Sequence, residues 1–169
     1  MKRVLIALLL LLALVLPGCS PRGEGFAIYL TRDDVPPADM ATADLNTVAL
    51  ESAPFIATKD IISYDAYIHE IELTPQAFES VDNMTVPMRG LSFVVCVDKK
   101  PVYWGAFWTL LSSQAFNGVT IWTNPVMTDK DNTSALELGY PAPSYDQGAD
   151  PRGNIVVLNA LRAAGKLKE

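Results

Sequence analysis

The sequence predicts an α+β fold, an antiparallel sheet with two main helices packed on one face, of which a ferredoxin-like unit is one version. Several short segments are apolar throughout or alternate between apolar and polar residues, as strands do. Two of these segments flank a tight turn at residues 98–101, which is typical of a hairpin. One helix is predicted between strands and another at the end of the chain, an order that favours an antiparallel sheet covered by helices on one side.

The first predicted elements of the domain are a strand and a long loop. Residues 26–30 form an apolar run that predicts a strand. Residues 31–44 are acidic and contain two adjacent prolines, so we expect a loop there. Residues 60–64 fit one helical turn capped by Asp60 as well as a loop, and the pattern does not separate the two.

A strand followed by a helix is predicted in the middle of the chain. Residues 67–73 alternate in polarity, which predicts a half-exposed strand with His69 on the same face as two apolar side chains. Thr74 and Pro75 fit the N-cap and first position of a helix, because proline loses no needed hydrogen bond there. We expect this helix to run to about Asn83.

The second half of the chain is predicted to supply most of the sheet. Residues 91–97 are an apolar strand that pairs with residues 102–109 across the turn at 98–101. Residues 119–122 and 136–140 are two further short strands.

The last predicted element is a helix over residues 155–164. Asn154 is placed to cap its first turn, and Gly165 follows its last residue, where glycine commonly ends a helix. Arg162 and Lys166 lie near its C-terminal end, where the helix dipole favours positive charge.

The first nineteen residues have the pattern of an export signal. Lys2 and Arg3 precede an apolar run over residues 4–16, which is shorter than the about 20 residues that a membrane-spanning helix needs. The run ends in Leu16-Pro17-Gly18-Cys19, which resembles the signal peptide of bacterial lipoproteins, although Pro17 departs from the commonest residue. This resemblance implies that residues 1–18 are removed and that Cys19 is lipidated, with fatty acids such as palmitate. A secretory signal with a coincidental cysteine and an uncleaved N-terminal anchor are the alternatives.

The resemblance divides the chain into three parts and implies a location. Residues 1–18 are the signal peptide, 19–25 a short lipidated tether, and 26–169 a single extracytoplasmic domain. Two or more acyl chains hold a protein on a bilayer essentially permanently. We therefore expect the protein to be lipid-anchored on the extracytoplasmic side of the cell membrane or of an outer membrane, and the sequence leaves this choice open.

Charge and composition argue against one class of partner. The chain carries a formal net charge of −6 and has no basic cluster, and losing Lys2 and Arg3 makes the remainder more acidic still. An acidic surface repels phosphate backbones. We therefore expect no nucleic-acid partner.

Residues 70–121 show a partial similarity to a second family. Glu70-Ile71-Glu72-Leu73-Thr74-Pro75, Phe93 to Lys100 and Gly118-Val119-Thr120-Ile121 resemble part of the extracytoplasmic domain of the protein-export subunit SecD. The return strand departs from that family, with Tyr103-Trp104-Gly105-Ala106 where the family tends to Ser-Ala-Pro. The resemblance implies a ferredoxin-like unit of sheet and helix, and it carries over no functional residue.

The aromatic stretch over residues 103–108 is the strongest candidate for a binding function. On a strand, Trp104 and Trp108 share one face, and Tyr103 lies on the other. Such rings usually build cores. If one side of the sheet is uncovered, however, they form an aromatic platform for a glycan, a peptide or a lipid. Tyr103, Trp104 and Trp108 are therefore the candidate ligand-binding residues.

Other reactive side chains stand in no catalytic or metal-binding pattern. His69 is the single histidine, and the two glutamates beside it point to the opposite strand face. Cys96 lies in an apolar strand and is expected to be a buried thiol. Residues 129–133 resemble the start of a calcium loop, but Ser134 and Tyr140 stand where an EF-hand needs glycine and glutamate. We predict no metal, no cofactor and no catalytic residue.

Three hypotheses for function follow. The leading one is a non-catalytic, lipid-anchored protein that binds a partner protein or ligand at the cell envelope. The second is a glycan or small-molecule receptor that uses the aromatic platform. The third is a hydrolase in which folding brings His69 and an acidic residue together.

Overall fold

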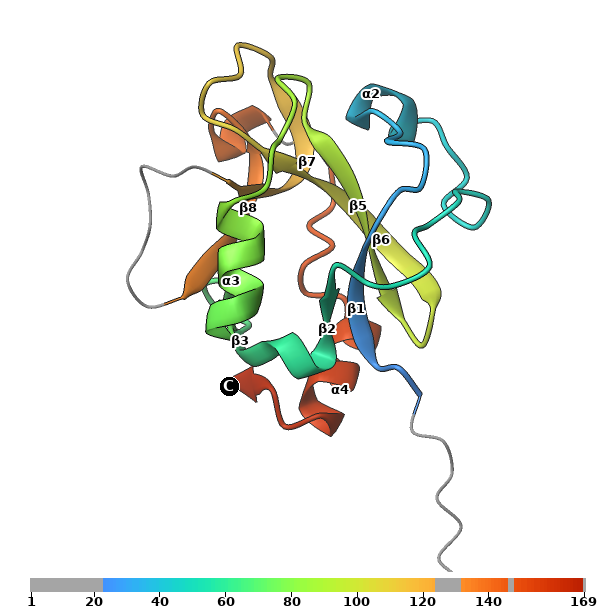
Figure 1. Cartoon of the computed structure of the whole chain (residues 1–169), viewed down its shortest axis with the longest axis vertical. Helices are drawn as coiled ribbons and strands as arrows, with labels where there is room; N and C mark the ends of the chain where they lie inside the picture. Colours follow the sequence, from blue (N-terminus) through green and yellow to red (C-terminus); the bar gives the residue numbers. More distant parts are fainter. Residues whose placement is uncertain (1–22, 124–131, 146–147, 169) are drawn as a thin grey trace, which may run out of the picture.

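The computed structural model describes residues 23–123, 132–145 and 148–168 (Figure 1). The predicted signal peptide, Cys19 and most of the tether over 19–25 lie outside the described residues. Within them the chain folds into one nine-stranded sheet with three short α-helices. None of these described helices has the length and apolar character needed to cross a membrane.

The elements are short, and two of the strands contain only two residues each. The strands are β1 (Phe26–Leu30), β2 (Ile56–Ala57), β3 (Ile61–Asp65), β4 (Glu70–Leu73), β5 (Leu91–Val97), β6 (Lys100–Trp108), β7 (Phe116–Trp122), β8 (Thr133–Tyr140) and β9 (Leu167–Lys168). The helices are α2 (Pro37–Met40), α3 (Pro75–Asp82) and α4 (Ile155–Ala163), with 3₁₀ turns η1 (Thr58–Asp60) and η2 (Pro143–Tyr145).

The sheet is mixed, so the prediction of an antiparallel sheet is wrong. Its strand order is β2-β1-β5-β6-β7-β8-β4-β3-β9, and the pairs β6–β7 and β3–β9 are parallel. Parallel neighbours are usually joined by a crossover of a dozen or more residues, often a helix. Here residues 109–115 alone return the chain from the end of β6 to the start of β7, a connection with no sequence signature.

The helices cover both faces of the sheet, so the prediction of two helices on one face is also wrong. Buried residues of α3 and α4 belong to the main core, among them Val81 and Leu161. The segment predicted as a loop contains α2, whose Met40 packs on the opposite face against Tyr29 and Val94. In Figure 1, α2 lies on the other side of β5 and β6 from α3. Because of the nine-strand order and this third helix, the arrangement is not the ferredoxin-like one expected.

Local predictions based on capping residues are confirmed. The Thr74 side chain accepts a hydrogen bond from Ala77 N (3.4 Å), and α3 starts at the next residue. The Asn154 side chain accepts from Val156 N (2.9 Å) at the start of α4. The strand predicted over 26–30 is β1 with the same bounds.

The segment around His69 differs from the prediction. Residues 61–65 are strand β3, and the next strand begins only at Glu70, so His69 lies in the hairpin turn with a φ of 55°. Asp65 Oδ1 accepts hydrogen bonds from Tyr67 N (2.9 Å) and Ile68 N (3.3 Å), which turns the chain at the end of β3. The strand predicted over residues 67–73 therefore begins three residues too early, because turn residues can continue an alternation by chance.

Candidate functional site

Strand β6 separates its aromatic side chains between two faces. Tyr103 is 7% exposed and lies in the main core together with Phe107. Trp104 and Trp108 are four residues apart, so they share one face of the strand, and this face is opposite to that of Tyr103. Tyr103 therefore cannot share a binding surface with the two tryptophans, and of the three candidate residues only Trp104 and Trp108 come together.

Gly105 lets β6 approach its neighbours closely. A Cβ atom at this position would lie 2.5 Å from Phe93 Cζ and 2.5 Å from the Val119 carbonyl oxygen. Both distances are far below van der Waals contact, so a larger residue would push β6 away from β5 and β7. Gly105 is therefore needed for the close packing of β6 between β5 and β7, and not for the approach of a ligand.

Trp104 and Trp108 join an aromatic cluster with the first residue of β7. Trp108 stacks on Phe116 with ring centroids 5.0 Å apart, and Trp104 meets the same ring edge-on at 5.6 Å. Trp108 also contacts Tyr140 at 5.7 Å. Trp108 is only 2% exposed, and its indole N–H meets no acceptor among the described residues, so packing holds this ring. Trp104 is half-buried and presents part of its surface.

A pocket of about 310 Å³ opens over this cluster, between α2 and the start of β7. Its lining combines the two tryptophans with prolines, alanines, two amides and one arginine. The lining residues are Pro36, Pro37, Ala38, Ala41, Arg89, Trp104, Trp108, Gln114, Ala115, Phe116 and Asn117.

Ser112 joins the two loops that form one side of the pocket. Its Oγ donates to Met88 O (2.6 Å) in the loop that carries Arg89, and it accepts from Gln114 N (3.1 Å). The Tyr140 hydroxyl donates to Ser112 O (3.0 Å). Ser112 is buried, so these bonds are at least partly shielded from water and hold both loops beside the tryptophans.

Gly90 brings α2, the arginine loop and β6 into contact. A Cβ at Gly90 would lie 2.3 Å from Trp108 Cζ3 and 3.2 Å from Pro37 Cγ. The residue also has a φ of 82°, which only glycine adopts without strain. The Trp108 ring therefore packs directly on this backbone, and the pocket floor is rigidly connected to its walls.

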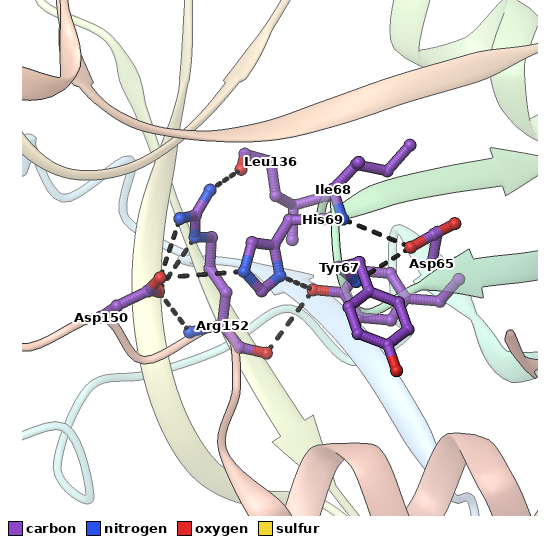
Figure 2. Close-up of polar contacts among 8 residues, drawn as sticks. Asp65, Tyr67, Ile68, His69, Leu136, Asp150 and Arg152 are labelled. Carbon is purple, nitrogen blue, oxygen red and sulfur yellow. Dashed lines mark hydrogen bonds and ion pairs between the residues drawn. The ribbon is translucent and has the colours of Figure 1, made fainter. Parts of the chain in front are cut away.

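A second group of polar residues surrounds His69. The Tyr64 hydroxyl is hydrogen-bonded to His69 Nδ1 (2.9 Å), and Asp150 Oδ2 lies 3.8 Å from Nε2. Arg152 holds Asp150 through its Nε and Nη2 atoms (2.9 and 2.8 Å), and its Nη1 donates to Leu136 O (2.6 Å). In Figure 2 the imidazole lies between Asp150 and the hairpin turn that carries Tyr67 and Ile68.

The environment keeps this group in its ordinary protonation states near neutral pH. Burial, followed by the Arg152 guanidinium, lowers the pKa of His69 below its usual 6.5, although Asp150 opposes this shift. Burial raises the pKa of Tyr64 to about 12. The hydrogen bonds from Arg152 lower the pKa of Asp150. At neutral pH the group therefore holds a neutral imidazole, a protonated phenol and a paired carboxylate.

The arrangement favours a structural role for His69. Folding does bring the histidine and an acidic residue together, as the hydrolase hypothesis requires. Both ring nitrogens, however, face protein groups, and among the described residues no serine, threonine or cysteine side chain is hydrogen-bonded to the imidazole. A general base needs a free nitrogen directed at a nucleophile. The group instead connects the β3–β4 hairpin to β8 and to the segment before α4.

The remaining reactive side chains form no catalytic or metal-binding site among the described residues. Cys96 is a free, fully buried thiol, as predicted, and burial raises its pKa to about 11. Such a thiol is unreactive at neutral pH. Among the described residues no group of three or more histidine, cysteine or acidic side chains could hold a metal ion. Residues 129–131 of the calcium-like stretch, and Cys19, lie outside the described part of the chain.

The sequence pattern does not predict several of the residues that form the pocket. Phe116 lies in a segment that was not predicted to be a strand, and Arg89 and Ser112 stand in loops with no motif around them. Their role depends on contacts between segments far apart in the chain, such as the bond from Ser112 to Met88. The two adjacent prolines were a signal for a loop, but not for a loop that closes over β6.

No protein-family model matches the chain, and no curated protein and no solved structure is significantly similar to it. The resemblances to a lipoprotein signal peptide and to part of SecD therefore stay predictions.

Proposed function

We propose that this chain is a non-catalytic, lipid-anchored binding protein of the cell envelope that takes a small ligand into the pocket over Trp104 and Trp108. The proposal combines the predicted lipidation at Cys19 with the pocket. It makes the receptor hypothesis the concrete form of the leading one, and Tyr103 has no part in it.

One observation carries the proposal: the half-buried Trp104 ring borders an open pocket whose walls are held in place. Ligand sites are usually concave, largely preformed and mostly apolar, with a few polar groups at defined positions. This pocket has the aromatic floor, and Gln114 and Asn117 add amide groups to its lining. At about 310 Å³ it lies at the small end of ligand pockets, so it suits one or two rings.

The chemistry of the lining indicates a ligand with a flat apolar face. Trp104 contributes an indole ring to the lining, and sugar rings and aromatic rings both pack well against such a ring. Pro36 and Pro37 form an apolar wall on the α2 side of the pocket. A ligand seated there would be enclosed by apolar surfaces and reach the amides at its edge.

A pair of matched tryptophan variants tests the proposal. Ligand-observed NMR would follow binding of N-acetylglucosamine oligosaccharides and of N-acetylated aromatic amino acids to the full chain in lipid nanodiscs. We expect at least one probe to bind, and Trp104→Ala to weaken it about tenfold or more. Trp122→Ala is the control, because Trp122 is also half-buried and packs edge-on against Tyr140 at 5.8 Å but does not line the pocket.

The result that would contradict the proposal is equally specific. If the two variants weaken a bound probe to the same extent, that probe is not held by the pocket. If no probe binds the wild type, the pocket does not accept rings of either kind.

The anchor is tested separately, by labelling cells with an alkyne analogue of palmitate. We expect the wild-type chain to carry the label and to sediment with membranes, and Cys19→Ser to lose both properties, because two or more acyl chains are needed for stable anchoring. A Cys19→Ser chain that keeps the label, or stays fully with membranes, would disprove lipidation at this residue.

A further inference from the structure

The pocket lining contains a single formal charge among the described residues. Arg89 supplies it, and every other lining residue is a proline, an alanine, an aromatic or an amide. No described residue forms an ion pair or a hydrogen bond with the Arg89 side chain, and that side chain is exposed. By contrast, the Arg152 guanidinium is fully occupied by Asp150 and Leu136 O. Arg89 is therefore available to an external group.

The backbone that carries Arg89 is held next to the aromatic floor. Met88 O accepts the hydrogen bond from buried Ser112, and Gly90 N donates to Pro87 O (2.8 Å). Gly90 itself packs against the Trp108 ring. The residues on both sides of Arg89 are thus fixed, so only its side chain has to be ordered when a ligand binds.

We infer that the ligand of this pocket carries an oxyanion, a carboxylate or a phosphate, that pairs with Arg89 while its apolar face packs on Trp104. This inference rests on the proposed function and adds the charge of the ligand. A guanidinium is always protonated and presents a fork of donors that matches the two oxygens of such a group.

The charge of the whole molecule makes this pairing selective. The chain has a net charge of −6, so its overall field disfavours anions. Screening limits that field to about 8–10 Å at physiological ionic strength, whereas a contact with Arg89 acts at a few ångströms. An anion that cannot also use the aromatic floor gains only the exposed ion pair with Arg89, which contributes little, so simple ions should bind poorly.

The test compares an acid with its neutral amide. Saturation-transfer NMR would give the dissociation constants of phenylacetate, phenylacetamide and phenyl phosphate for the full chain in nanodiscs, with empty nanodiscs subtracted. We expect the wild type to prefer phenylacetate over phenylacetamide roughly three- to fivefold at low ionic strength, since exposed ion pairs contribute modestly. High salt should reduce this preference.

Two charge variants assign the effect to Arg89. Arg89→Gln should abolish the preference for the acid, because it weakens the binding of phenylacetate more than that of phenylacetamide. Lys100→Gln removes the same charge from the first residue of β6, which does not line the pocket, and it should keep the preference. Tighter binding of phenyl phosphate than of phenylacetate would assign a phosphate, and the reverse order a carboxylate.

The outcomes separate the inference from the proposed function. If acid and amide bind equally and Arg89→Gln changes neither, the pocket binds ligands but the inference is wrong. If Lys100→Gln removes the preference as completely as Arg89→Gln, the effect is one of net charge and the inference is again wrong. If none of the three probes binds the wild type although a sugar or an N-acetylated aromatic amino acid does, the inference is wrong and the proposed function stands.

Discussion

At the scale of single residues, His69 connects the stability of the protein to pH. Its pKa is lowered in the folded chain by burial and by Arg152, so the folded state binds fewer protons than the unfolded state below the usual value of 6.5. The stability it contributes is fully present above that value and is lost as the pH falls below it. Urea unfolding at pH 7.5 and 5.5 should show a lower free energy of unfolding at pH 5.5.

The variant His69→Gln isolates this contribution, because the chain has no other histidine. We expect the variant to lose most of the difference between the two pH values, although its stability at pH 7.5 also falls. An unchanged pH dependence in His69→Gln would show that other groups cause it.

Gly105 makes a second residue-scale prediction. Gly105→Ala would place a Cβ 2.5 Å from Phe93 and from the Val119 carbonyl oxygen, and the backbone oxygen cannot move without disturbing β7. We expect a loss of about 1–3 kcal/mol in the free energy of unfolding. Gly153→Ala is the matched control, since a Cβ there would meet nothing within 4 Å. Equal effects of the two variants would refute the packing argument.

At the scale of elements, Ser112 is predicted to hold the pocket together. Ser112→Ala removes the hydrogen bonds to Met88 O and from Gln114 N. We expect it to lower the free energy of unfolding by about 1 kcal/mol and to weaken binding of pocket probes. Denaturant unfolding and probe titration check this, with the exposed neighbour variant Ser113→Ala as control. Unchanged probe affinity in Ser112→Ala would mean that the loops keep their place without it.

The same scale shows which elements could be predicted from sequence. Thr74 and Asn154 marked the starts of α3 and α4, because capping is a local interaction between neighbouring residues. Helix α2 was missed, since four residues that follow Pro36 carry no periodicity and are held by the burial of Met40. Strand β3 was missed because its pairing with β4 depends on the Asp65 turn.

At the scale of the whole molecule, the sheet order and the pocket were beyond local patterns. β6 pairs in parallel with β7, and β3 pairs in parallel with the short β9. No turn motif in the sequence predicts either pair. The alternation of faces on β6 did correctly separate Tyr103 from Trp104 and Trp108. It could not show that α2 and two loops would leave a pocket over the tryptophans, because these segments lie far apart in the chain.

Ligand binding should have a localised effect on the whole molecule. Hydrogen exchange measured with a bound probe should slow in residues 36–41, 87–90 and 112–117, which surround the pocket. Exchange in the β3–β4 hairpin should stay the same, because the His69 group and the pocket share no residue. Slower exchange confined to the hairpin would place the ligand at His69 instead.

The central claim is that a ligand covers Trp104, and acrylamide quenching of tryptophan fluorescence tests it most directly. In a Trp122→Phe background, Trp104 is the accessible tryptophan of the pair that remains, since Trp108 is 2% exposed. We predict measurable quenching in the free protein that a pocket probe suppresses, and that disappears when Trp104→Phe is added. Quenching that persists unchanged with a saturating bound probe would contradict the account, because the ligand would then lie elsewhere.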